Sequence, residues 1–225
     1  MTAQPVPSTP DIELEVCGRV WKLARTADLE TLWARMGEED SGEDERLPYW
    51  TEVWPAGIAL CSWLLQKRDD IRGHLCVDMG CGLGLTALVA QWLGARVLAM
   101  DYEAEALRCA RDNAARNNIV SPLWTVMDWR WPALAPRRAR YLWGGDIMYE
   151  ARFASPLLDF MEYALAPGGC VWVAEPCRSV YDVFRGALHS RGWVGRCVHE
   201  QCLEALYAQP VPVTVRVWEL TRQGF

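Results

Sequence analysis

The sequence has little of what binding to nucleic acid or insertion into a membrane requires. Its 225 residues carry 23 basic and 29 acidic side chains, a formal net charge of -6, and only Lys22 and Lys67 are lysines. The densest basic run, Arg137, Arg138 and Arg140, is too short to follow a phosphate backbone. No stretch reaches the ~18 uncharged apolar residues of a membrane span. We therefore expect neither a nucleic acid nor a membrane as partner.

Cysteine is present, but not in the pattern of a disulfide framework. The nine cysteines are odd in number, scattered and mostly set in apolar stretches, which predicts reduced thiols in the core. Cys197, His199 and Cys202 have no fourth ligand nearby, so we expect no metal site. Residues 1–10 lack the charged and apolar regions of a secretion signal. These absences together predict a cytoplasmic protein.

What the chain does contain is enough apolar material, 51% of its residues, for one main globular domain. We expect a disordered lead over 1–10, an N-terminal hairpin, helix and acidic loop over 11–47, and the main domain over 48–225. The hairpin comes from alternating residues in 12–16 and 20–23, and the helix over 27–36 has Thr26 or Asp28 as its cap. Six of the eight residues in 38–45 are acidic, which is typical of a solvated loop, with a docking site for a basic partner as the alternative.

Beyond residue 74 short apolar strands alternate with helical patterns. Strands are expected over 75–79, 96–101, 123–127, 140–143, 170–174, 193–198 and 211–220, and helices over 58–66, 85–93, 103–117 and 180–190, with a turn at 167–169. This alternation predicts an α/β fold, a doubly wound and mostly parallel seven-stranded sheet with helices on both faces. The connection over 200–210 looks too irregular for a crossover helix, so the last strand is expected to run antiparallel.

A glycine-rich turn follows the first strand of this series. It reads Gly80-x-Gly82-x-Gly84, and Asp78 lies two residues ahead of it. Ligands bind at the carboxyl ends of strands in such sheets, and glycines let the backbone approach them closely. The spacing differs from the G-x-G-x-x-G of dinucleotide-binding proteins, and Asp78 would repel a pyrophosphate but attract an ammonium group. The turn therefore predicts a cofactor with an amino-acid end.

Two more acidic residues follow the next two strands. Asp101 ends the second strand and can accept hydrogen bonds from both hydroxyls of a ribose. Asp128 follows the third strand, where the amino group of an adenine would need an acceptor. Partners for an ammonium, a ribose and an adenine, in this order, fit S-adenosylmethionine. The simpler interpretation makes each acid a helix cap or a loop residue.

Two further motifs complete the pattern: the aromatic segment Pro48–Gly57 before the first strand, and Gly145-Asp146-Ile-Met-Tyr149-Glu150 after the fourth. With them the chain resembles, over about residues 48–220, the seven-stranded class I S-adenosylmethionine-dependent methyltransferases. Within these it is most similar to the lysine methyltransferase group that includes the electron-transfer flavoprotein β-subunit enzyme. That group has a D-x-x-Y signature after the fourth strand. The N-P-P-Y tetrapeptide of enzymes that methylate nucleobase amines is absent.

The resemblance implies an N-methyltransferase that acts on a lysine of a protein, releases S-adenosylhomocysteine and needs no metal. It implies that Trp54 packs over the cofactor and that Asp146 and Tyr149 line the methyl-acceptor site. Asp146 would orient the lysine ammonium, and the Tyr149 hydroxyl would anchor the amine or the cofactor. Trp50 and Trp54 would offer ring faces to a cation. Two alternatives stay open: a small-molecule amine N-methyltransferase, and an interaction module that binds the cofactor without turnover.

Overall fold

A computed structural model describes residues 11–35, 48–204 and 211–222, so the expected lead over 1–10 and the acidic segment 38–45 lie outside the described residues. The main sheet is mostly parallel, and its last strand runs antiparallel to both of its neighbours, which confirms the predicted fold. The strand order is β5 (Leu123–Val126), β4 (Arg96–Asp101), β3 (Leu75–Met79), β6 (Ala139–Gly145), β7 (Leu165–Glu175), β9 (Val213–Arg222) and β8 (Trp193–Leu203).

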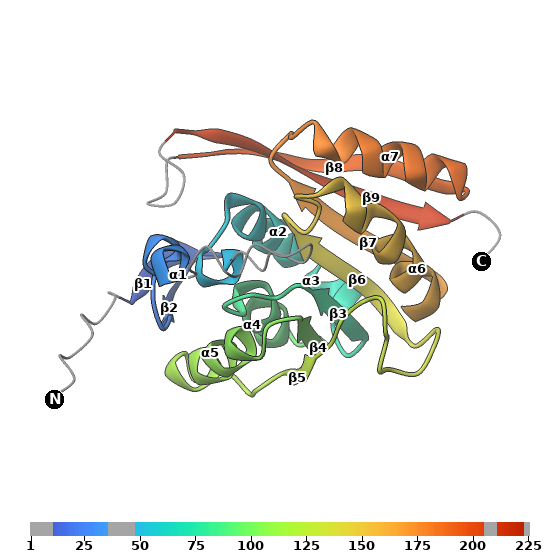
Figure 1. Ribbon diagram of the computed structural model, residues 1–225. Coiled ribbons are helices and arrows are strands. Elements are labelled where there is room, and N and C mark those ends of the chain that lie inside the picture. Colours follow the sequence, from blue (N-terminus) through green and yellow to red (C-terminus); the bar gives the residue numbers. More distant parts are fainter. Residues whose placement is uncertain (1–10, 36–47, 205–210, 223–225) are drawn as a thin grey trace, which may run out of the picture.

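Helices cover both faces of this sheet (Figure 1). One face carries α2 (Pro55–Gln66), α4 (Leu85–Trp92) and α5 (Ala104–Arg116), and the other carries α6 (Ala154–Ala164) and α7 (Val180–Ser190). The short elements are α3 (Arg68–Ile71) and the 3-10 turns η2 (Tyr49–Thr51) and η3 (Ala151–Phe153). Each face buries its own apolar cluster, as expected of strands that are covered on both sides. None of the described helices is both long and apolar enough to cross a membrane.

The largest differences between the structure and the sequence prediction concern α2, β8 and β7. Helix α2 begins at Pro55, three residues earlier than expected, because proline at the first helical position costs no hydrogen bond. Strand β8 continues to Leu203, well beyond its predicted end. Residues 167–169, predicted as a turn, belong to strand β7, with Gly168 at a φ of 68°. The pairing of β6 with β7 is irregular here, with a register shift between Ala139 and Tyr141.

The cysteines divide between core and surface. Cys61, Cys76, Cys81 and Cys109 are buried, Cys17 and Cys170 are half-buried, and all nine thiols are free. The prediction of core thiols is wrong for three that are exposed, Cys177, Cys197 and Cys202. These three lie in the loop after β7 and on β8, where the surrounding apolar residues alternate with exposed positions.

The N-terminal segment forms the predicted hairpin and helix. Strands β1 (Ile12–Val16) and β2 (Arg19–Leu23) pair antiparallel through a two-residue turn, in which Cys17 and Gly18 both have positive φ, as a tight hairpin turn requires. Helix α1 (Leu29–Arg35) is capped by Asp28, whose Oδ1 accepts a hydrogen bond of 2.7 Å from the Thr31 N–H. Of the two predicted caps, Asp28 is therefore the one used.

Two asparagines at the end of α5 attach this N-terminal unit to the main domain. The Asn117 side chain accepts from the Lys22 N–H at 3.0 Å and donates to the Lys22 carbonyl at 2.8 Å, so it pairs with the strand as another backbone would. Asn113 bonds in the same way to the N–H and carbonyl of Ala24 and also donates to the Leu83 carbonyl. Both side chains are buried, so their loss would leave buried backbone groups without partners.

We expect Asn117→Ala to lower the free energy of unfolding by about 1 to 3 kcal/mol, because it removes the partner of the backbone N–H and carbonyl of Lys22. Urea denaturation followed by tryptophan fluorescence measures the loss. The control is Asp112→Ala, an exposed position on the same helix, with an expected change within about 0.5 kcal/mol. Equal effects of the two substitutions would contradict the proposed attachment.

Candidate active site

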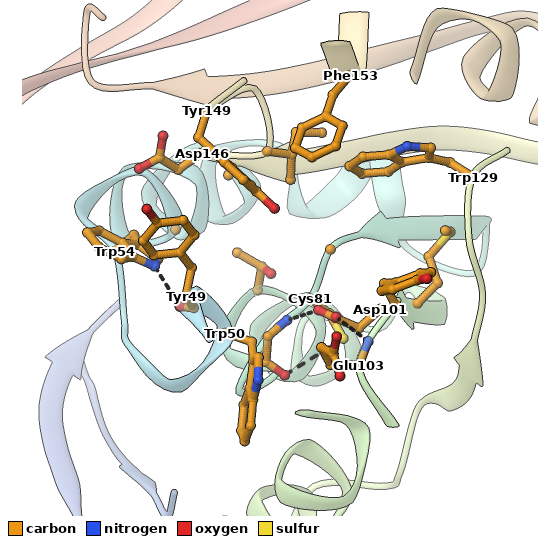
Figure 2. Close-up of a pocket in the computed structure, with 18 of the residues that line it drawn as sticks. Tyr49, Trp50, Trp54, Cys81, Asp101, Glu103, Trp129, Asp146, Tyr149 and Phe153 are labelled. Atoms are coloured by element: carbon orange, nitrogen blue, oxygen red, sulfur yellow. Dashed lines mark hydrogen bonds between the residues drawn. The ribbon is translucent and has the colours of Figure 1, made fainter. Parts of the chain in front are cut away.

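A cavity of about 950 Å³ lies beyond the carboxyl ends of four neighbouring strands, β5, β4, β3 and β6. Parallel pairing places the loops after these strands at one edge of the sheet, where ligands of doubly wound folds bind. The described lining residues come from segments 49–57, 80–86, 100–103, 127–130 and 145–156, together with Arg178. In Figure 2 aromatic side chains lie along one side of this pocket, and Asp101, Glu103 and the glycine loop lie on the other.

The glycine loop approaches the pocket with bare backbone. Gly80 and Gly82 have φ values of 71° and 50°, a backbone conformation that residues other than glycine rarely adopt. A Cβ at Gly82 would lie 3.2 Å from the Trp50 carbonyl oxygen, and one at Gly80 would lie 3.1 Å from Ile147. At these two positions the loop fits between the aromatic segment and the loop after β6 only without a side chain, and both glycines line the cavity.

Asp101 fixes this loop to the end of β4. Its Oδ2 accepts a hydrogen bond of 2.8 Å from the Gly82 N–H, and its Oδ1 accepts one of 3.0 Å from the Glu103 N–H. Burial raises the pKa of the Asp101 carboxyl, while these two backbone hydrogen bonds oppose the rise. Each carboxylate oxygen can accept a second hydrogen bond, so the predicted contact with two hydroxyls remains available. Glu103 also lines the pocket, and the sequence analysis did not select it.

Asp78 lies outside the lining of the cavity. Its carboxyl group is 1% exposed, and its Oδ2 accepts a hydrogen bond of 2.5 Å from the Thr86 hydroxyl at the start of α4. Burial raises its pKa to about 7, although the hydrogen bond from Thr86 opposes the rise. The structure therefore places Asp78 behind the glycine loop, in contact with the first turn of α4, and outside the lining of the cavity.

Gly84 is also absent from the cavity lining, so a direct contact with a cofactor does not follow from its position. It is the N-cap of α4, with a φ of 89°. A Cβ there would lie 2.9 Å from the Cβ of Ala110 and 3.2 Å from Trp124. The third glycine of the motif is therefore needed for close packing of α4 against α5.

Asp128 lines the pocket, but Arg130 already binds it. Its Oδ1 accepts from the Arg130 N–H and its Oδ2 from Nε, both at 2.8 Å, with Nη2 at 2.7 Å. The predicted contact with an adenine amino group stays a prediction, since it must share this carboxylate with Arg130. The neighbouring Trp129 lies on the same wall and was missed by the sequence analysis, because its loop has no regular periodicity.

Five aromatic rings follow one another along the pocket wall. Tyr149 contacts Tyr49 with ring centroids 5.2 Å apart and Phe153 at 5.1 Å, and both contacts are edge-to-face. Trp54 extends the row beyond Tyr49 at 5.9 Å, and Trp129 extends it beyond Phe153 at 5.6 Å. The Trp54 indole N–H donates to the Tyr49 carbonyl at 2.8 Å, which fixes its ring at the start of α2. Trp50 lines the pocket as well.

Asp146 and Tyr149 lie together on one wall of the same cavity. Asp146 has a φ of 55°, and its N–H donates to the Ala174 carbonyl at 2.9 Å, so the sheet itself holds the turn. Burial raises the pKa of Asp146, and Arg178, whose Nη1 lies 3.2 Å from Oδ1, lowers it. Burial also raises the pKa of Tyr149 to about 12, so this phenol stays protonated at neutral pH.

Comparison with known proteins identifies the family of the chain. A model of the family described as lysine methyltransferase matches residues 41–183, more than half of the chain. The chain belongs to the lysine methyltransferase family. Relatives include the electron transfer flavoprotein beta subunit lysine methyltransferases of Xenopus laevis, 33% identical over 60% of this chain and 55% of that protein, and of Danio rerio, 38% identical over 60% and 52%. The chain thus spans about half the length of the curated relatives it matches.

Ribosomal protein L11 methyltransferases are also similar, for example that of Pseudomonas syringae, 33% identical over 52% of this chain and 37% of that protein. Among solved structures, the fold matches a T. thermophilus 16S rRNA methyltransferase in complex with AdoMet and guanosine, with a TM-score of 0.65 and 15% identity. That match covers 99% of this chain and 53% of the other. A putative RNA methyltransferase from Pyrococcus horikoshii matches with a TM-score of 0.62 and 16% identity, over 86% and 97%. At these identities the likeness concerns the fold.

In this member of the lysine methyltransferase family, Glu52 is a further lining residue that the sequence analysis did not select. Glu52 is 7% exposed, and its Oε1 accepts from the Leu29 N–H at 3.0 Å and pairs with Arg25. The ion pair is buried and joins the N-terminal unit to the aromatic segment over the glycine loop. Sequence reasoning missed it because its partner lies 27 residues away in a separate unit.

We expect Gly84→Ala to lower the free energy of unfolding by about 2 to 4 kcal/mol, because the new Cβ combines an unfavourable φ with the contact to Ala110. Urea denaturation measures it. The matched control is Gly186→Ala within α7, where the Cβ has open space and a gain of about 0.5 to 1 kcal/mol is expected. An unchanged stability for Gly84→Ala would show that this glycine is not required for packing.

The raised pKa of Asp78 makes the free energy of unfolding depend on pH. In the unfolded chain Asp78 loses its proton near pH 4, whereas in the folded protein it keeps the proton up to about pH 7. The folded state therefore binds more protons in this window, and its stability falls as pH rises from about 4 to about 7. We expect Asp78→Asn, which keeps an acceptor for Thr86, to reduce this slope in urea denaturation. Asp112→Asn should leave the slope unchanged, and equal slopes for both variants would contradict the assignment.

Proposed function

We propose that this protein is an S-adenosylmethionine-dependent N-methyltransferase that methylates a lysine side chain of a protein. The observation that carries the proposal is that one cavity joins two sets of residues. The glycine loop and Asp101 suit the cofactor, and Asp146 and Tyr149 suit an amine. Membership of the lysine methyltransferase family supports the same assignment.

The residues at the ends of β3, β4 and β5 fit S-adenosylmethionine. Gly80 and Gly82 leave space where side chains would enter, and Asp101 presents a carboxylate to the ribose hydroxyls. Asp128 and Trp129 are placed to bind the adenine, the carboxylate at its edge and the indole at its face. Trp54 lines the cavity at the start of α2. When bound, the cofactor supplies a methyl group that its positive sulfur has already activated.

The charge of the pocket supports a cationic cofactor and a cationic acceptor. The described lining contains six carboxylates and three guanidinium groups, so it is negative overall. The sulfonium and ammonium groups of the cofactor and the ammonium group of a lysine are all favoured in such a field. The six carboxylates are Glu52, Asp101, Glu103, Asp128, Asp146 and Glu150, and the three guanidinium groups are those of Arg130, Arg152 and Arg178.

The chain's own residues then have three tasks on the acceptor side. Asp146 binds the lysine ammonium and orients its nitrogen, which must lose a proton before it can attack. The Tyr149 hydroxyl, protonated at neutral pH, holds the amine or the cofactor by a hydrogen bond. The rings of Tyr49, Tyr149 and Phe153 exclude water from the line of transfer.

A protein acceptor is proposed because of the relatives. Their names state that they methylate the electron transfer flavoprotein beta subunit or ribosomal protein L11. The cytoplasmic location stays a prediction from the sequence.

Calorimetric titration tests the cofactor. We expect S-adenosylmethionine and S-adenosylhomocysteine to bind, and dinucleotides not to bind. Asp101→Ala should weaken binding at least about tenfold, because it removes charged hydrogen bonds to the ribose and the anchor of Gly82. Asp112→Ala on the surface of α5 is the control for the loss of one negative charge. Unaltered affinity in Asp101→Ala would count heavily against the site.

Transfer of a labelled methyl group tests the acceptor. The candidates are the electron transfer flavoprotein beta subunit, ribosomal protein L11 and a panel of small amines. Labelling of a protein at lysine supports the proposal, and labelling of small amines alone would replace it with the small-molecule alternative. Cofactor binding without any S-adenosylhomocysteine formed would instead identify a non-catalytic module.

A further inference from the structure

Three ionisable side chains meet where β6 and β7 end: Asp146, Glu175 and Arg178. The side chain of Asp146 is 7% exposed, and Glu175 is similarly buried as the last residue of β7. Arg178 is 42% exposed and lines the cavity together with Asp146. The proposed mechanism uses Asp146 alone, so it leaves the positions of Glu175 and Arg178 unexplained.

The backbone builds this cluster with two unusual residues. Asp146 and Cys177 have φ values of 55° and 57°, which non-glycine residues adopt at a cost. The backbone conformation of Asp146 is held by the pairing of Gly145 with Ala174 and by the hydrogen bond from the Asp146 N–H to the Ala174 carbonyl. Arg178 follows the second and lies just before α7. The loops after β6 and β7, which begin at neighbouring strands of the sheet, therefore bring Arg178 to Asp146.

The cluster contains more negative than positive charge, and one carboxylate oxygen of Asp146 is available to a further cation. Arg178 contacts Oδ1 of Asp146, and within the described part of the chain Oδ2 receives no hydrogen bond. Glu175 accepts from the Trp218 indole N–H at 3.1 Å through Oε1, whereas its buried Oε2 has no partner among the described residues. Glu175 acts on Asp146 through its charge, which raises the pKa of Asp146, and Arg178 is the cation paired with Asp146. Two buried carboxylates and one guanidinium leave an excess of negative charge, which favours a further cation.

We propose that Arg178 is a positioning residue for the methyl acceptor. It is the counter-ion at Oδ1 of Asp146, so that Oδ2 of the same carboxylate stays available for the acceptor ammonium. Glu175 supplies the additional negative charge that makes binding of a second cation favourable. This inference rests on the proposed function and extends it to how the amine is held. The lysine ammonium then completes a cluster of two carboxylates and two cations.

The electrostatics of Asp146 agree with this arrangement. Burial raises its pKa, Glu175 raises it further, and Arg178 lowers it. Tyr149 and Tyr49 contact each other within the same cavity, and Glu150 pairs with Arg152 at 2.7 Å. The first turn of α2 lies against Gly145, and this helix carries no ionisable side chain except the Cys61 thiol. Arg178 is therefore the cation that opposes the rise in the pKa of Asp146 and favours the charged form that can hold an ammonium group.

The test measures binding of n-butylammonium, a mimic of the lysine side chain, to protein saturated with S-adenosylhomocysteine. An alkylammonium stays protonated below about pH 10, so loss of binding on acidification reports protonation of the protein. We expect wild-type binding to be lost as pH falls through the pKa of Asp146. Arg178→Gln should move this midpoint to higher pH and weaken binding about threefold at the wild-type midpoint. Glu175→Gln should move it to lower pH.

Two further variants make the result specific. Arg178→Lys restores a cation at Oδ1 and should return the midpoint toward that of the wild type. Arg196→Gln removes an exposed arginine paired with Glu219 on the far strands β8 and β9, and should leave the midpoint unchanged. Affinity for S-adenosylhomocysteine, measured first in each variant, shows that the variant is folded.

Several results would overturn the inference. Midpoints that coincide in wild type, Arg178→Gln and Glu175→Gln would show that neither residue acts on the ammonium site. Tighter binding by Arg178→Gln at every pH would show that the guanidinium competes with the amine for Asp146. Absence of saturable binding to the loaded wild type would show that no ammonium site exists. Failure of the wild type to bind S-adenosylhomocysteine is a different outcome, which refutes the proposed function itself.

Discussion

The parallel pairing of β3 with β4 on one side and β6 on the other is the constraint on which the site depends. It brings the glycine loop, Asp101 and the loop that carries Asp146 to one edge of the sheet, although they are far apart in sequence. Asp101 then joins the loops directly, because its carboxylate accepts from the N–H groups of Gly82 and Glu103. Without this pairing, the residues that we propose bind the cofactor and the acceptor would not face a common cavity.

Three carboxyl groups in or behind the pocket, those of Asp78, Asp101 and Asp146, share a pKa that is raised by burial. Desolvation raises the pKa values of Asp78, Asp101 and Asp146, but each has a different partner. Asp78 accepts from a hydroxyl, Asp101 from two backbone N–H groups, and Asp146 has Arg178 beside it. Asp78 therefore binds the first turn of α4 behind the glycine loop, Asp101 fixes this loop to β4, and Asp146 is the carboxyl group that we propose binds the acceptor.

The N-terminal unit contributes to the site through one buried contact. Arg25 and Leu29 both bind the Glu52 carboxylate, which belongs to the segment that lies over the glycine loop. Asn113 and Asn117 attach the same unit to α5. The hairpin and α1 therefore stabilise the wall of the pocket, although none of their described residues lines the cavity.

The sequence by itself determined the strands, the helices, the glycine turn and the antiparallel last strand, because apolar periodicity and glycine spacing are local properties of the chain. The sequence also indicated Asp101 from its position at the end of a strand, whereas Asp146 and Tyr149 were implied by the resemblance to a known family; the structure brings all three to one cavity. Only the tertiary structure decided that Asp78 lies behind the loop and that Gly84 packs against α5 without lining the cavity. It also decided that Glu52 and Arg178 join the site, because their positions depend on contacts between segments distant in sequence, which no local pattern records.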